Sequence, residues 1–199
     1  MEEKDIETEV IHLDEIPKEN KPSLMKEVFS FLRDVIISLI IGLLLIHFVI
    51  RPVQVEGSSM YPTLQNRAIG VSNLLGYRMD GIKRFDIVII YEEESDKYLV
   101  KRAIGLPGET ISFKNGKLYI NGEKTAEDFL NSSYKDSYNG VFTDDMDEIT
   151  LGEEEYFCMG DNRPHSTDSR YYGPFKRDRI ISKGIMILYP LNQFGPRNW

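Results

Sequence analysis

The sequence predicts a mainly β protein with antiparallel sheets, joined to one N-terminal transmembrane helix. An uncharged, mainly apolar run fills residues 35–50, and short apolar runs separated by turn residues follow Pro52. After that proline no long stretch repeats with the period of a helix, so most of the chain is expected to form strands. The 199 residues suffice for one compact domain with appendages.

The apolar run at 35–50 predicts a membrane span. It holds no formal charge, and only Ser38 and His47 are polar. A span needs about 20 residues, and the stem of Arg51 with the apolar residues after it extends the run, so we place the transmembrane helix at 35–52. No small-x-small cleavage site follows, which argues against a removed signal peptide. The alternative, a buried helix of a soluble protein, is less favoured because the run is apolar all round.

Basic residues are more frequent before this run than after it. Residues 18–34, before the run, contain Lys18, Lys21, Lys26 and Arg33, and the equally long stretch 51–67 after it contains Arg51 and Arg67. For a single-pass protein of the cell membrane, the positive-inside rule therefore places the N-terminus in the cytoplasm and the large domain outside. Residues 1–34 would form a short cytoplasmic tail, and residues 53–199 an extracytoplasmic β domain.

Charge and cysteine content exclude other classes. The formal net charge is −8; residues 1–34 contribute −5 (five Lys/Arg, ten Asp/Glu) and the remainder −3 (19 Lys/Arg, 22 Asp/Glu). A nucleic-acid-binding protein would show a basic stripe, so no nucleic-acid partner is expected. The single cysteine, Cys158, excludes an internal disulfide and is expected to be buried. Cysteine and histidine do not cluster with metal-site spacing, so neither a metal nor another cofactor is expected.

Short apolar runs in the β part have the length and composition of strands. They are Phe85–Tyr91, Tyr98–Ile104, Thr110–Phe113, Lys117–Ile120, Tyr156–Met159 and Ile185–Tyr189. Asn115-Gly116 between two of them predicts a two-residue hairpin turn. A variable insertion is placed at about 114–152. Within it, residues 124–152 are polar, acidic and tyrosine-bearing, which indicates a surface segment of low order.

Lys101 interrupts one of these apolar strand patterns. It alternates with Leu99 and Ala103, so the adjacent Arg102 is expected on the opposite face. A free lysine has a pKa of about 10.4, but burial among apolar neighbours can lower it by several units. A drop of about 3 units costs roughly 4 kcal/mol and makes the amine a workable base. The alternative is an ordinary exposed lysine.

Ser59 lies in a turn-like segment, residues 57–63, where Gly57 and Pro62 favour a tight backbone. Such a turn would expose the hydroxyl, and the backbone N–H of the same residue could form part of an oxyanion hole. A serine nucleophile needs a base, but histidine is scarce, and His12 lies before the membrane span. The alternative is an ordinary serine-rich turn.

A third segment, residues 160–170, is dense in small polar residues and opposite charges. It would either hold hydroxyls and ion pairs beside a site or form a solvated loop. Together, four segments in chain order resemble the motifs of bacterial type I signal peptidases, the prokaryotic Ser/Lys-dyad type of peptidase family S26. They are Ser-Met-x-Pro-Thr-Leu (59–64), Arg-Phe-Asp-Ile-Val (84–88), Lys-Arg-x-Ile-Gly-Leu-Pro-Gly-Glu (101–109) and Gly-Asp-Asn-Arg-x-x-Ser-x-Asp-Ser-Arg (160–170). The resemblance runs from the membrane anchor to about residue 190 and is weakest in 114–152.

The resemblance implies a signal-peptidase/repressor-protease-like β-fold, with Ser59 as acylating nucleophile and Lys101 as general base. It also implies that Ser166 orients the lysine. Other positions match charged residues that support the site: Asp161 with Arg102, and Asp168 with Arg170. The positions that match walls of the family's substrate pockets are Val53, Val55, Met60, Leu64, Leu99 and Val100. Small pockets there would select small side chains at the first and third positions before the cut.

Two positions depart from the family pattern. Some members have a serine as oxyanion donor two residues before the nucleophile, where this chain has Gly57. Ser58 or a backbone N–H would then have to compensate. Pro164-His165 replaces a stretch that is often Asp-Asn. His165 is not expected to act as a base, because the lysine fills that role.

These implications predict a membrane-anchored serine endopeptidase that cleaves N-terminal signal peptides from exported preproteins through an acyl-enzyme. Its partners would be preproteins with small-x-small cleavage sites and the lipid bilayer. Three alternatives remain. A self-cleaving repressor-type protease would need a DNA-binding domain, for which residues 1–34 are too short and acidic. A catalytically silent binding module is compatible with Gly57. A structural membrane protein would leave the motifs unexplained.

Overall fold

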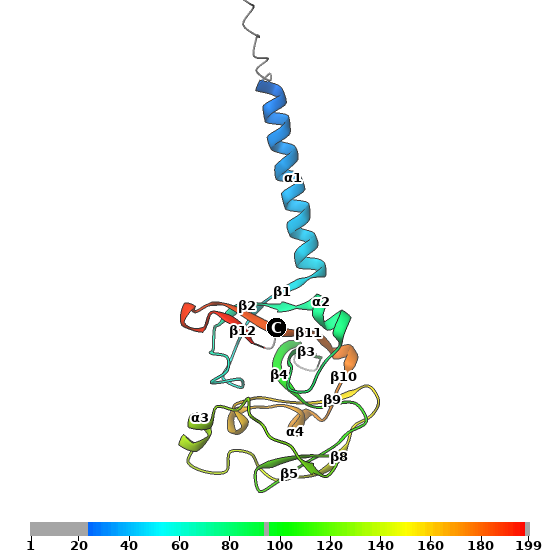
Figure 1. Ribbon diagram of the computed structural model, residues 1–199, viewed down its shortest axis with the longest axis vertical. Coiled ribbons are helices and arrows are strands. Elements are labelled where there is room, and N and C mark those ends of the chain that lie inside the picture. Colours follow the sequence, from blue (N-terminus) through cyan, green and yellow to red (C-terminus); the bar gives the residue numbers. More distant parts are fainter. Residues whose placement is uncertain (1–23, 94–95, 198–199) are drawn as a thin grey trace, which may run out of the picture. The chain divides into compact units, whose positions relative to one another are not determined.

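The computed structural model describes residues 24–93 and 96–197 (Figure 1). Helix α1 (Leu24–Phe48) has no buried side chain, and by length and composition it is able to cross a membrane. It begins before the predicted residue 35 and ends before residue 52, because Ile50 already belongs to strand β1 (Ile50–Gln54). Pro52 lacks an N–H and is tolerated on an edge strand, which explains why the helix does not continue through it. Residues 1–23 of the predicted tail lie outside the described residues.

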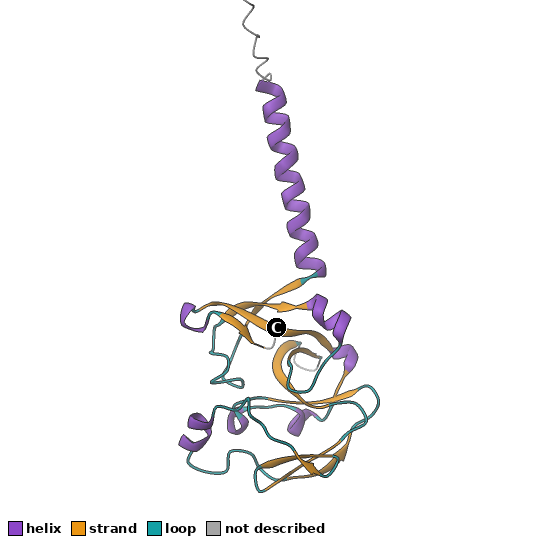
Figure 2. Ribbon diagram, in the orientation of Figure 1, coloured by secondary structure: helices purple, strands orange, loops and turns teal. Residues whose placement is uncertain are grey.

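The remaining elements are mainly strands, as predicted (Figure 2). The larger sheet has eight strands in the order β1-β2-β11-β3-β4-β9-β10, and β12 pairs with β11. Every paired neighbour is antiparallel. The strands besides β1 are β2 (Ile69–Asn73), β3 (Ile87–Glu92), β4 (Lys97–Gly105), β9 (Glu155–Met159), β10 (Phe175–Lys176), β11 (Ile180–Tyr189) and β12 (Gly195–Arg197).

The smaller sheet has four strands in the order β7-β6-β5-β8. They are β5 (Thr110–Lys114), β6 (Lys117–Ile120), β7 (Glu123–Lys124) and β8 (Met146–Thr150). The hairpin predicted at Asn115-Gly116 is confirmed: φ is 52° at Asn115 and 66° at Gly116, the positive values that a type I′ turn requires.

Short helices connect the strands. They are α2 (Leu74–Asp80), α3 (Ser132–Ser137), α4 (Ser169–Tyr172) and the 3₁₀ turns η1 (Arg163–His165), η2 (Arg177–Arg179) and η3 (Leu191–Gln193).

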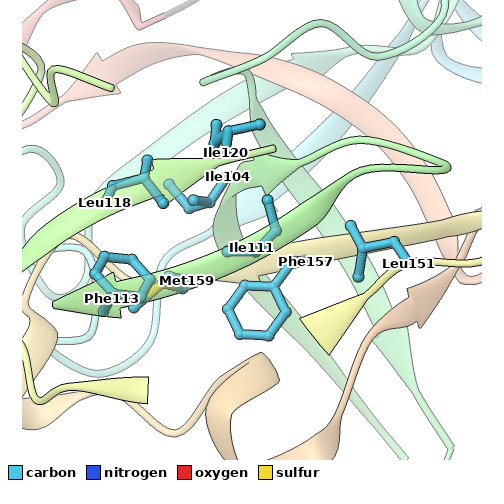
Figure 3. Close-up of a cluster of buried hydrophobic side chains, with 8 residues drawn as sticks. All are labelled: Ile104, Ile111, Phe113, Leu118, Ile120, Leu151, Phe157 and Met159. Atoms are coloured by element: carbon cyan, nitrogen blue, oxygen red, sulfur yellow. The ribbon is translucent and has the colours of Figure 1, made fainter. Parts of the chain in front are cut away.

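Three apolar clusters hold the β domain together. The first joins the two sheets (Figure 3): Ile104, Phe157 and Met159 from the larger sheet meet side chains of the smaller one. Those partners are Ile111, Phe113, Leu118 and Ile120, with Leu151 after β8. Each such side chain contributes about 1.5–3 kcal/mol on burial. The other two clusters lie on β3, β4, β9 and β11, and one of them includes the turn that carries Ser59.

The prediction of low order for residues 124–152 is wrong. The segment contains α3 and β8, and β8 pairs with β5. Phe142 and Thr143 are buried, and the Glu127 carboxylate is paired with Arg163. The side chains that anchor residues 124–152 are isolated and widely spaced along the chain, so they produce no periodic pattern in the sequence.

Candidate active site

Ser59 lies in the connection between β1 and β2. Backbone hydrogen bonds close the base of this connection: the Val55 N–H donates to the Ala68 carbonyl at 2.8 Å, and the Arg67 N–H donates to the Val55 carbonyl at 2.8 Å. Val55, together with Met60 and Leu64, is buried in one apolar cluster, while Ser59 is only partly covered. The turn is therefore anchored by its apolar residues and leaves the serine at the surface of the core.

Lys101, on β4, is buried: its exposed fraction is 3%. Its Nζ donates a hydrogen bond to Ser166 Oγ at 3.2 Å. Burial lowers the pKa of Lys101 from 10.5 to about 8, against the opposing attraction of the Asp168 carboxylate. Leu99 and Ala103 belong to the apolar cluster on the predicted lysine face of the strand. A substantial fraction of this amine is therefore neutral near pH 8, as a general base requires.

The 160–170 loop contacts both residues. The Asn162 N–H donates to the Ser59 carbonyl at 2.9 Å, and its side-chain Nδ2 donates to the Ser58 carbonyl at 3.0 Å. Four residues further along, Ser166 accepts the hydrogen bond from Lys101. One short loop thus fixes the serine turn and the lysine.

Gly160 occupies the narrowest point of this arrangement. A Cβ at this position would lie 2.3 Å from Ser166 Oγ and 2.4 Å from the Ser59 carbonyl oxygen, far inside van der Waals contact. Glycine is required here because the loop backbone passes between these two site residues.

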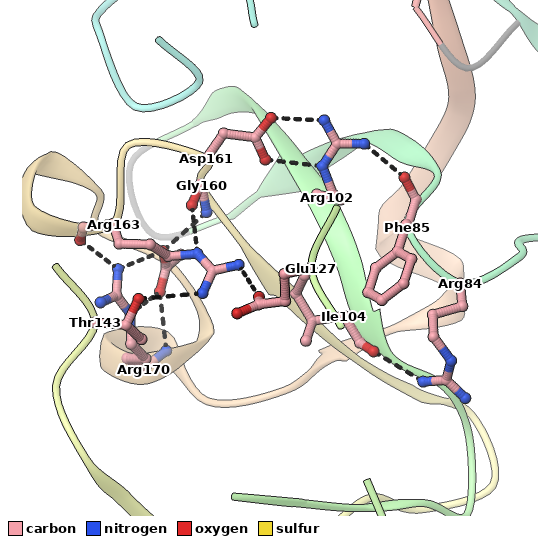
Figure 4. Close-up of polar contacts among 11 residues, drawn as sticks. Arg84, Phe85, Arg102, Ile104, Glu127, Thr143, Gly160, Asp161, Arg163 and Arg170 are labelled. Atoms are coloured by element: carbon pink, nitrogen blue, oxygen red, sulfur yellow. Dashed lines mark hydrogen bonds and ion pairs between the residues drawn. The ribbon is translucent and has the colours of Figure 1, made fainter. Parts of the chain in front are cut away.

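A buried ion pair connects the loop to β4 (Figure 4). Arg102 Nε donates to Asp161 Oδ1 at 2.8 Å and Nη2 to Oδ2 at 2.6 Å, and both side chains are nearly inaccessible. Arg102 Nη1 also donates to the Phe85 carbonyl at 2.8 Å. The Thr63 hydroxyl donates to Asp161 Oδ2 at 2.6 Å, so this carboxylate also holds the end of the serine turn.

A second ion pair braces the other end of the loop. Arg170 Nε donates to Asp168 Oδ1 at 2.9 Å, and Nη2 donates to Oδ2 at 2.9 Å. The Gly160 N–H donates to the same carboxylate at 3.0 Å. Burial alone would raise the pKa of Asp168, but the hydrogen bonds and charge of Arg170, with the Gly160 N–H, lower it below its usual value. Asp168 is therefore a carboxylate beside the lysine.

Gly57 has a different role from the family serine. Its φ is 85°, a left-handed conformation that L side chains rarely adopt. Its N–H donates to Asn66 Oδ1 at 3.0 Å, so this donor is already engaged. Ser58 is exposed, and its carbonyl is held by Asn162. The geometry at Gly57 therefore favours glycine over the serine that some family members have at this position.

The six predicted pocket residues divide into two groups. Val55, Met60 and Leu64 are at most 3% exposed and form part of the core. Val53, Leu99 and Val100 are half-buried, and the last two lie within two residues of Lys101 on β4.

Sequence reasoning gave no role to three residues that the structure brings to the site: Thr63, Asn162 and Tyr134. Thr63 and Asn162 lie within the matched motifs, but nothing in the sequence indicates which carbonyl or carboxylate they contact. His165 is exposed, and its ring packs edge-on against Tyr138. Within residues 24–93 and 96–197, no group of three His, Cys, Asp or Glu side chains is placed to hold a metal ion.

The β domain contains a partly covered serine and a buried lysine of lowered pKa, and one loop contacts both. This combination indicates a serine hydrolase with a lysine base as the class of protein to test. Comparison with known proteins gives the family. Residues 28–189 match the family described as "Signal peptidase, peptidase S26". The chain therefore belongs to the signal peptidase family S26, among the bacterial type I enzymes, which are hydrolases.

Relatives in several bacteria are similar over nearly their whole length. "Signal peptidase I S" of Bacillus subtilis (strain 168) is 36% identical over 185 residues, covering 91% of this chain and 100% of that protein. "Signal peptidase I T" of the same strain is 42% identical over 163 residues, covering 80% and 84%. "Signal peptidase IB" of Staphylococcus aureus (strain COL) is 30% identical over 181 residues, covering 86% and 94%. The crystal structure of a signal peptidase I from Enterococcus faecalis V583 is 37% identical, with a TM-score of 0.48 over 51% of this chain and 95% of that one.

Proposed function

We propose that this protein is a membrane-anchored serine endopeptidase that removes signal peptides from exported preproteins by means of a Ser59/Lys101 dyad. The observation that carries the proposal is the 160–170 loop, which contacts the Ser59 turn through Asn162 and Lys101 through Ser166. Family membership supports the substrate class.

The chemistry follows from the protonation state of Lys101. Neutral Lys101 takes the proton of the Ser59 hydroxyl as Oγ attacks the scissile carbonyl. The Ser59 N–H donates to the oxyanion. The C–N bond then breaks, the lysine ammonium returns its proton to the leaving amine, and an acyl-enzyme remains. Water, deprotonated by the same amine, releases the signal peptide and regenerates Ser59. Ser166 holds Nζ in place throughout.

Open strand edges give the substrate a place to bind. Within the described part of the chain, β1 pairs on one side only, with β2. Among residues 24–93 and 96–197, β3 is the one strand paired with residues 97–101 of β4, because pairing with β9 begins at Arg102. An extended cleavage region can add to these edges by main-chain hydrogen bonds, with Val53, Leu99 and Val100 as walls that select small side chains.

Helix α1 supplies the anchor in this proposal. The expected order of a cytoplasmic tail, a transmembrane helix and a catalytic domain on the extracytoplasmic face of the cell membrane is kept, with the helix ending at Phe48 and the catalytic domain beginning at β1. The precursor is held in the same bilayer by its own apolar segment. Shared attachment raises the effective concentration of the cleavage site near Ser59.

Ser59→Ala is expected to abolish processing. Detergent-solubilised full-length protein is incubated with a preprotein bearing an Ala-x-Ala site, and product is followed by gel electrophoresis. Loss of the nucleophile should lower kcat by about 10⁴-fold or more. The matched control is Ser133→Ala, an exposed serine on α3, which should cleave like wild type. Equal processing by Ser59→Ala would contradict the dyad, and no processing by wild type would favour a silent binding module.

Gly160→Ala is expected to lower kcat by about 10²-fold, the loss associated with a displacement of about 1 Å at a site. The added methyl must displace either Ser166 or the Ser59 carbonyl. Gly152→Ala is the control, since its Cβ would meet the flexible Glu155 side chain at 3.3 Å. Steady-state kinetics with the preprotein measures kcat for both variants. A Gly160→Ala variant with wild-type kcat would show that the close approach is unimportant for catalysis.

A further inference from the structure

We propose that Tyr134, on helix α3 of the insertion, is a positioning residue for the nucleophile. It acts through the side chain of Asn162 on the backbone that carries Ser59. This inference rests on the proposed function and adds to it a role for the 124–152 segment, the part of the chain where the motif resemblance is weakest.

A chain of hydrogen bonds leads from Tyr134 to the serine turn. The Tyr134 hydroxyl donates to Asn162 Oδ1 at 3.0 Å. The Asn162 Nδ2 then donates to the Ser58 carbonyl at 3.0 Å, and the Asn162 N–H donates to the Ser59 carbonyl at 2.9 Å. A carboxamide has a donor end and an acceptor end, so the tyrosine hydroxyl at Oδ1 keeps the donor end turned toward Ser58. Asn162 is 2% exposed, so bulk water does not substitute for this partner.

The aromatic ring of Tyr134 supports the same turn from a second direction. It packs edge-on against Tyr61, two residues after Ser59, with ring centroids 5.1 Å apart and an interplanar angle of 79°. The ring of Phe142 also packs edge-on against Tyr134, with ring centroids 6.1 Å apart. Tyr134 therefore contacts both Asn162, which fixes the Ser58 and Ser59 carbonyls, and Tyr61, two residues after the nucleophile.

Side-chain contacts attach the insertion to the 160–170 loop, so that the position of Tyr134 relative to that loop is fixed. Arg163, fully buried, pairs with the Glu127 carboxylate of the insertion and donates through Nη1 to the Thr143 hydroxyl at 3.4 Å (Figure 4). Its Nε donates to the Gly160 carbonyl at 3.1 Å. The start of α3 is capped by Asn131, whose Oδ1 accepts from the Tyr134 N–H at 2.8 Å. Two adjacent loop residues, 162 and 163, are thus each held by the insertion.

Tyr134→Phe tests the hydroxyl without removing the ring. Losing the hydrogen bond that orients Asn162 should lower kcat for the preprotein about three- to tenfold, with KM within about twofold, because the serine turn rather than the substrate edge is disturbed. Tyr119→Phe on β6 is the matched control and should keep wild-type kcat. Thermal unfolding shows whether each variant is folded at the assay temperature. An unchanged kcat for folded Tyr134→Phe would overturn the proposal.

A double-mutant cycle tests the route through Asn162. If Tyr134 acts through that side chain, Tyr134→Phe should have no further effect on kcat in an Asn162→Ala background. Effects that multiply would instead mean a merely structural contribution and overturn the proposal.

Hydrogen exchange gives a readout independent of cleavage. In the full chain in detergent, Tyr134→Phe should speed exchange of the Asn162 N–H bound to Ser59, and Tyr119→Phe should not. If wild type cleaves and Ser59→Ala does not, the proposed function stands and the Tyr134 variants decide this inference. If wild type fails to cleave, the proposed function fails, and faster exchange supports the positioning role while unchanged exchange overturns it.

Discussion

Raising the pH from 6 to 8 is expected to increase kcat/KM for preprotein cleavage by about 50-fold, because the amine of Lys101 must be neutral to act as the proposed base. Its pKa, lowered to about 8 by burial, leaves about 1% of the amine neutral at pH 6 and about half at pH 8. The rate should rise along a limb with this pKa and level off above it. Initial rates at fixed, subsaturating preprotein across this range measure the limb. A limb near the ordinary lysine value of about 10.4 would contradict the role of burial.

The burial of Lys101 also lowers the stability of the folded state. The dependence of folding stability on pH is therefore a second measurement of the same pKa. The unfolded chain keeps a lysine pKa near 10.5, so between about pH 8 and 10.5 it binds more protons than the folded chain, and stability rises with pH across this window. Below pH 8 the folded state carries the full cost of the buried ammonium, about 3 kcal/mol.

Lys101→Met removes that cost and the base together. Cleavage should be lost, while the thermal midpoint at pH 7 should rise by roughly 6–12 °C. The advantage over wild type should shrink toward zero as the pH approaches 10.5. Lys124→Met, an exposed residue of β7, is the control and should change neither property. A less stable Lys101→Met variant at pH 7 would mean that the ammonium is well compensated.

Asp161→Ala is expected to destabilise the β domain by about 3–5 kcal/mol, the usual cost of removing one partner of a buried ion pair. The Arg102 guanidinium keeps the Phe85 carbonyl and the Phe129 ring but loses its bidentate carboxylate. Thr63 loses its acceptor at the same time.

Thermal or urea unfolding in detergent measures the loss. Asp147→Ala, which removes an exposed carboxylate from β8, should stay within about 0.5 kcal/mol of wild type. A loss below about 1 kcal/mol for Asp161→Ala would show that the remaining partners satisfy Arg102. Any fall in kcat of the folded variant would report the displacement of the serine turn through Thr63.

Local sequence patterns were sufficient to predict much of the secondary structure of the β domain. Period-2 alternation around Lys101 correctly separated the face of Leu99 and Ala103 from that of Arg102, because successive side chains of a strand point to opposite faces. Asn115-Gly116 identified its hairpin because few residue pairs adopt positive φ twice in succession. The predicted start of α1, residue 35, was less accurate, because the helix begins at Leu24. Apolar content marks the part of a helix that is able to span a membrane and not the polar turns that continue it.

The 124–152 segment shows where such patterns fail. Tyr134 and Glu127 are ordinary surface residues by composition, and their partners Asn162 and Arg163 lie far along the chain. A contact of this kind leaves no periodicity on either side, so the segment was expected to have low order. Met60 and Leu64, which the family resemblance assigns to pocket walls, are buried in the structure, and their burial likewise depends on residues distant in the chain.

The sequence by itself determined the antiparallel β class, the apolar helix, the family, and the identity of Ser59 and Lys101 as the candidate pair. All of these depend on residue type, order and short-range alternation. The tertiary structure decided how that pair is held. The burial that lowers the lysine pKa, the close approach at Gly160, and the support of Asn162 by Tyr134 depend on packing between segments distant in sequence. Desolvation and hydrogen-bond geometry are properties of the assembled core, and no local stretch of sequence encodes them alone.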